Sequence, residues 1–277
     1  MHTSAIRVMA TGILLLSCFV LISCSGSSGP EPGTPGFYWA AANETFNTKD
    51  YVKTIEHLEK LTATNNDYTA RARPWLLVMT SGMARGYMDL GDNFEAGARA
   101  NKANPTDFRR HTSTYRGEAD RLAVEFAETL GKFQQGKDDP VPIAYPFPGG
   151  NAAPVMELTK AATGILMAPA EIEPAEKRAI NRAILLQASA AAGAPDDVAK
   201  AQDILKPGTL TVPRAAFVTF MASTLFDESK LYGLQQLDKP DRVTIFCNRA
   251  LDALKTVPET KETKDLSTKI TKSMKKK

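Results

Sequence analysis

The chain has 277 residues, of which 43% are hydrophobic and 23% are charged, values typical of a folded protein and not of an intrinsically disordered one. Its 34 basic and 31 acidic residues leave a net charge of only +3, too small to indicate nucleic-acid binding. Three cysteines and three histidines exclude a disulfide scaffold and argue against a zinc site with several ligands.

The first 24 residues have the layout of a secretory signal. Arg7 precedes an apolar run over residues 12–22, which is too short to span a bilayer but has the length of a signal-peptide core. The run ends in Leu21, Ile22, Ser23 and Cys24, which resembles the bacterial lipobox. That resemblance implies a signal peptide over residues 1–23 and a lipidated Cys24 at the mature N-terminus. The alternative is that Cys24 merely follows an ordinary cleavage site.

Residues 24–36 are rich in Ser, Gly and Pro and predict a flexible tether, because such a composition cannot bury apolar surface. The residue after Cys24 is Ser25 and not Asp. By resemblance to the sorting rule of enteric lipoproteins, this implies an anchor at the periplasmic face of the outer membrane.

Residues 37–136 predict a region of helical hairpins. Two segments match when the sequence is shifted by 42 residues, and each reads as helix, tight turn and helix, with the turns at residues 47–50 and 89–92. The matched positions are Ala42, Phe46, Asp50, Tyr51, Thr54 and Leu58 in the first copy, and Ala84, Met88, Asp92, Asn93, Ala96 and Ala100 in the second. A third, fainter copy surrounds residues 189–197.

The second copy, with Ala84, Tyr87, Leu90, Gly91 and Asp92, resembles the tetratricopeptide (TPR) repeat, although its period exceeds the usual repeat of about 34 residues. The resemblance implies an α-solenoid in which hairpins stack to bury their apolar faces. Further along the same region, one apolar stripe predicts a single long helix. Its members are Phe108, Tyr115, Ala119, Leu122, Phe126, Leu130 and Phe133.

Residues 137–154 form a Pro- and Gly-rich loop between two helical halves, because neither helix nor central strand tolerates so many prolines. Ile143, Tyr145 and Phe147 alternate with prolines there and could present apolar side chains to a partner. The alternative is that they fasten the loop to the protein's own helices.

Residues 155–257 predict a second helical region, and no strand pattern is evident, so the predicted fold is all-α. Cys247 lies on the apolar stripe of its last helix, where it is expected to pack in the core. The Lys-rich residues 258–277 predict a frayed, solvated tail, or one that contacts anionic lipid or wall polymer.

No nucleotide-binding, metalloprotease or hydrolase motif is found in the sequence. We therefore predict no catalytic residues, no metal ligands and no cofactor. His111 is expected at the edge of the core, and His57 in solvent.

Three functions follow as hypotheses. The first is a lipid-anchored, non-catalytic scaffold that binds envelope proteins or peptides during envelope assembly or transport, without nucleic acid. The alternative is a helical solute-binding component that resembles those of tripartite uptake systems, with Gly82, Gly86, Trp39 and Trp75 around a chamber. The third is a cell-wall-active enzyme.

Overall fold

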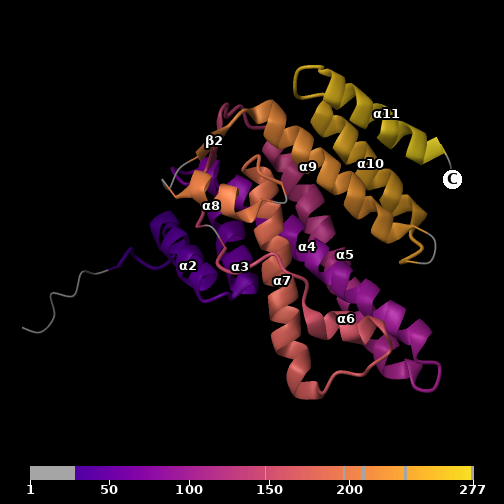
Figure 1. The fold of residues 1–277 in the computed structure, drawn as a ribbon. Coiled ribbons are helices and arrows are strands. Elements are labelled where there is room, and N and C mark those ends of the chain that lie inside the picture. Colours follow the sequence, from indigo (N-terminus) through magenta and orange to yellow (C-terminus); the bar gives the residue numbers. More distant parts are fainter. Residues whose placement is uncertain (1–28, 147, 196, 207–209, 234–235, 276–277) are drawn as a thin grey trace, which may run out of the picture.

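The computed structural model describes residues 29–275, except 147, 196, 207–209 and 234–235. The described chain is mostly helical (Figure 1). Its helices are α2 (Pro35–Asn47), α3 (Tyr51–Thr62), α4 (Thr69–Ala100), α5 (Pro105–Gln134), α6 (Met156–Ala162), α7 (Pro169–Ala191), α8 (Val198–Leu205), α9 (Arg214–Glu228), the 3-10 turn η1 (Ser229–Tyr232), α10 (Pro240–Leu254) and α11 (Lys261–Lys275).

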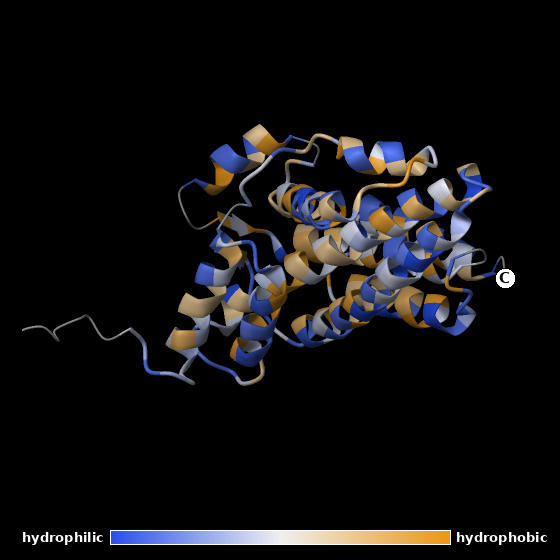
Figure 2. Cartoon of the chain, turned by 90° about the horizontal axis from the view of Figure 1, so that it is seen from below, coloured by the Kyte–Doolittle hydropathy of each residue, from blue (hydrophilic) through white to orange (hydrophobic). Residues whose placement is uncertain are grey.

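The long helix α4 is the centre of the fold. It packs along α5 and α7 and also contacts α3, α6 and α9, so its middle is buried on several sides. The buried residues of the two predicted helical halves form one core, because α7 lies directly against α4. Helices coloured by hydropathy alternate between apolar and polar residues, as amphipathic helices must when one face is buried (Figure 2).

The helix predicted from the stripe that begins at Phe108 is confirmed as α5. All seven stripe residues are buried, and α5 packs along α4. The expected helix–turn–helix over residues 42–58 is also confirmed. Asp50 ends that turn and caps α3, because its carboxylate accepts a hydrogen bond from the backbone N–H of Lys53 at 3.3 Å.

The turn predicted at residues 89–92 is wrong, because α4 continues through it without a break. Gly91 lets α5 approach: a Cβ there would lie 3.2 Å from Cγ of Arg116. Gly91, which suggested a turn, therefore allows α4 and α5 to pack closely. The second copy of the 42-residue repeat does not form a hairpin. No solenoid is detected in the described part of the chain, which corrects the predicted array.

The all-α prediction needs a second correction, for a small antiparallel ribbon. Strand β1 (Val141–Ile143), in the Pro-rich loop, pairs with β2 (Leu210–Val212), and Pro142 faces Thr211. A two-stranded ribbon tolerates proline because each strand has only one partner. Three-residue strands are also too short to produce an alternating pattern in the sequence.

The predicted solvated tail over residues 258–277 is instead helix α11 over most of its length. Leu266, Ile270 and Met274 recur at helical spacing and pack in or against the core, with Ile270 fully buried, and Thr263 on the same face is buried as well. The folded unit therefore includes α11, which lies against α10 and α9. Among the described residues, no helix combines the length and the apolar character that a bilayer crossing requires.

Candidate functional site

The sequence-predicted site residues fall in different places. Cys24 and the lipobox lie outside the described residues, as does Phe147. Ile143 is fully buried and Tyr145 is only 5% exposed, and the Tyr145 ring stacks on Trp75 of α4 at 6.2 Å between centroids. Neither side chain is available to a partner in this structure. Their burial agrees with the alternative interpretation, in which they fasten the loop to its own helices.

The Pro-rich loop is also held by polar contacts from α7. The side-chain amide of Asn181 donates to the carbonyl of Gly149 at 2.8 Å, and Nε of Arg182 donates to the carbonyl of Ala152 at 2.7 Å. The hydroxyl of Tyr51 donates to Asn181 from the other side. Asn181 of α7 therefore links the Pro-rich loop on one side to Tyr51 of α3 on the other.

The residues suggested as a solute chamber are packed against neighbouring helices. A Cβ on Gly82 would lie 2.9 Å from Cα of Ile184, and one on Gly86 would lie 3.1 Å from Cα of Ile180. These glycines let α4 and α7 approach closely. Trp75 is fully buried, and Trp39 stacks on Tyr68 at 5.5 Å.

An open hollow beside these helices is the strongest candidate site. It lies between the start of α3, the middle of α4 and the first half of α7, and has a volume of about 560 Å³. We call it the tyrosine groove. It is lined by Thr48, Lys49, Asp50, Tyr51, Val52, Met83, Tyr87, Glu176, Lys177 and Ile180. Val52, at its edge, is 48% exposed, unusual for a large apolar side chain.

Glu176 is the polar centre of the tyrosine groove. Its carboxylate accepts a hydrogen bond from the hydroxyl of Tyr115 at 3.3 Å and another from Tyr87. The two tyrosine rings stack at 6.2 Å. Burial raises the pKa of Glu176 above its ordinary value, while the tyrosine hydrogen bonds act in the opposite direction. Burial also raises the pKa of Tyr87 to about 12, so this hydroxyl remains a donor at neutral pH.

The charges at the edge of the groove are mostly paired. Lys177 contacts Glu173 at 2.6 Å, and Lys53 contacts Asp50 at 3.0 Å. Glu176 makes no ion pair with any described residue. Glu176 is thus a carboxylate without an ion pair among the described residues. It lies beside the apolar side chains of Met83 and Ile180 and interacts electrostatically with the neighbouring Lys177.

Sequence reasoning missed this groove. Tyr51, Tyr87, Tyr115 and Glu176 come from four helices, and no local spacing connects them. In the sequence, Tyr115 lies on the apolar stripe of α5 and Tyr87 among the residues that resemble a TPR repeat, so neither is expected at a binding site.

Within the described ranges, no group of His, Cys, Asp or Glu is arranged to hold a metal ion. Cys247 is buried, as predicted. In comparisons with protein-family models, curated proteins and solved structures, nothing matches this chain.

Proposed function

We propose that the protein is a lipid-anchored component of the cell envelope that binds a partner protein or peptide in its tyrosine groove, without catalysis. The lipobox at residues 21–24 and the Ser-rich tether support an anchor through Cys24, at the periplasmic face of the outer membrane. The observation that carries the binding role is the tyrosine groove beside the α2–α3 hairpin.

The groove's chemistry favours a partner segment with a basic side chain next to an apolar one. A Lys or Arg side chain can pair with the Glu176 carboxylate, which is only partly buried. The apolar neighbour can fill the space beside Met83, Ile180 and Val52. A volume of about 560 Å³ holds a few side chains and not a folded domain.

A solute-binding role is the second candidate, because the same volume lies within the range of small-molecule sites. The ligand would be a cationic metabolite with an apolar part. A ligand of the folded state raises the melting temperature. In a thermal-shift screen of small cationic metabolites, the solute-binding role predicts a raised melting temperature with at least one compound, and the partner-binding role predicts none. A cell-wall-active enzyme remains a third proposal, based only on analogy with other lipoproteins.

We expect a photoreactive amino acid at Val52 to cross-link one reproducible partner when the full-length, anchored protein is expressed in its native host. Adding Glu176→Gln should reduce the yield about tenfold, because the neutral amide keeps the shape of the side chain but cannot form the charged pair. Cross-linked products are identified by mass spectrometry.

Ile245 provides the matched control. It is an apolar side chain of similar exposure, 52%, on α10, away from the groove. If Val52 and Ile245 give the same products, or if Glu176→Gln leaves the yield at Val52 unchanged, the groove is not the partner site.

A further inference from the structure

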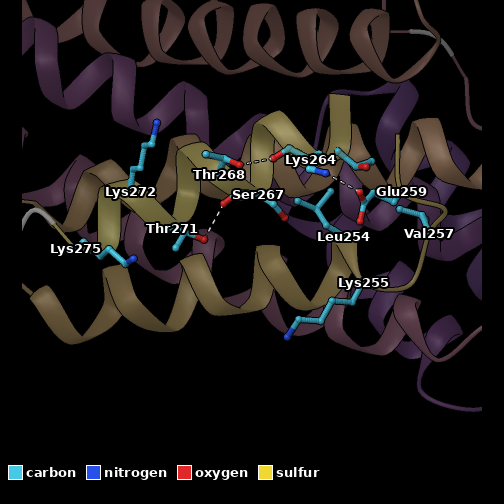
Figure 3. Close-up of a pocket in the computed structure, with 11 residues that line it drawn as sticks. Leu254, Lys255, Val257, Glu259, Lys264, Ser267, Thr268, Thr271, Lys272 and Lys275 are labelled. Carbon is cyan, nitrogen blue, oxygen red and sulfur yellow. Dashed lines mark hydrogen bonds and ion pairs between the residues drawn. The ribbon is translucent and has the colours of Figure 1, made fainter. Parts of the chain in front are cut away.

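The C-terminal helix hairpin carries a second hollow, which is separate from the tyrosine groove. It lies between the end of α10, the connection over residues 255–260 and one side of α11, and has a volume of about 590 Å³ (Figure 3). We call it the lysine groove. Its lining residues are Leu254, Lys255, Val257, Glu259, Thr263, Lys264, Ser267, Thr268, Thr271, Lys272 and Lys275.

The lysine groove is strongly basic, with four lysines and a single carboxylate among its lining residues. Lys264 contacts Glu259 at 3.3 Å, and Lys255 contacts Asp252 at 2.8 Å, but all four side chains are more than half exposed. Exposed pairs of this kind contribute little to stability, so their lysines can turn to an anionic ligand. Lys272 and Lys275 make no ion pair with any other residue that the structure describes.

The charged positions follow the length of α11. Lys264, Thr268, Lys272 and Lys275 recur at helical spacing, so they share one side of the helix over about 16 Å. Ser267 lies between them, and its hydroxyl makes no hydrogen bond within the described ranges. A single small anion cannot reach ammonium groups at both ends of this stripe. A chain with repeated negative charges can.

The opposite side of α11 is already occupied, because Ile270 is buried and Leu266 and Met274 pack on the core. The helix therefore cannot insert this apolar side into a bilayer without leaving α9 and α10. In Figure 1, α11 also lies at the end of the molecule away from α2. Both observations favour a ligand other than the membrane that holds the anchor.

We propose that the lysine groove binds a linear anionic polymer of the cell envelope, with phosphate groups along its length. This site goes beyond the proposed function, and only the location of the polymer rests on the proposed anchor. Binding to the isolated protein depends on neither the anchor nor the partner of the tyrosine groove.

The test measures binding of linear inorganic polyphosphate, long enough to span the stripe, to the purified full-length protein in detergent. At about 50 mM salt, the triple variant Lys264→Gln, Lys272→Gln, Lys275→Gln should bind at least tenfold more weakly than the wild type. Its affinity should also fall less steeply with salt, because fewer counterions are released.

The matched control replaces three exposed lysines elsewhere, as Lys102→Gln, Lys137→Gln, Lys200→Gln. It removes the same charge and should change the affinity less than twofold, and Glu176→Gln should leave it unchanged. If both triple variants weakened polyphosphate binding equally, the binding would depend on the overall charge of the protein and not on the lysine groove. Equally strong competition by orthophosphate at matched total phosphate would reject a polymer site. If the protein bound phosphatidylglycerol vesicles through these lysines but did not bind polyphosphate, the lysine groove would be a membrane-binding site and the polymer proposal would be wrong.

Discussion

Replacing Trp75 with alanine should lower the free energy of unfolding by about 3–5 kcal/mol. The side chain is fully buried in α4 and lies at the centre of an aromatic cluster. The rings of Trp39 and Phe46 each lie 5.5 Å from it, and that of Tyr145 lies 6.2 Å from it. Its removal would leave a cavity where α2, α4 and the Pro-rich loop meet. Urea unfolding followed by circular dichroism measures the change.

Trp39→Ala is the control for this prediction. Trp39 belongs to the same cluster but is only partly buried, so its loss exposes a surface that water can reach and costs less. Equal losses for the two variants would contradict the central position of Trp75. A loss below about 1 kcal/mol for Trp75→Ala would mean that the cluster is not tightly packed.

Replacing Arg214 with alanine should lower the free energy of unfolding by about 2–4 kcal/mol. This side chain is only 8% exposed. Its guanidinium donates to the carbonyl of Phe133 at 2.9 Å and to that of Asp138 at 3.3 Å. The Phe133 carbonyl belongs to the last turn of α5, where the helix dipole favours a cation, and Asp138 lies shortly after the helix ends. The guanidinium also lies 4.6 Å from the centre of the Phe133 ring.

Arg214→Lys should recover only part of this loss, because an ammonium group cannot reach several carbonyls as the planar guanidinium does. Both variants are compared with the wild type by urea unfolding with matched slopes. If Lys restored full stability, the positive charge alone would account for the effect. If Arg214→Ala cost nothing, the carbonyls at the end of α5 would have to be satisfied without Arg214.

The sequence predicted those parts of the fold in which one periodic signal dominates. The stripe from Phe108 to Phe133 became α5 because each step of three, four or seven residues returns to the same helix face. Gly91 misled the prediction because a glycine looks the same in a turn and in a close helix contact. The C-terminal lysines likewise outnumber the apolar residues of α11, yet Ile270 and its neighbours at helical spacing determine its packing.

The lipidation site could be predicted from the sequence, but the two grooves could be predicted only in part or not at all. The lipobox is a local pattern of four neighbouring residues. The tyrosine groove depends on side chains from helices that are far apart in the chain, so only the fold brings Tyr51, Tyr87 and Glu176 together. The lysine groove is intermediate, because its charges were evident in the sequence but the helix that aligns them was not.

The location of the protein in the envelope underlies both the partner role and the location of the polymer. Mass spectrometry of the mature N-terminus, on protein extracted from membranes of the native host, tests it most directly. We predict a first residue Cys24 that carries a diacylglyceryl group. We also predict release into the soluble fraction by Cys24→Ala. Cys18→Ala should cause no release, because Cys18 lies within the signal peptide predicted over residues 1–23. An unmodified N-terminus that begins at another residue, in protein recovered from the soluble fraction, would contradict the account.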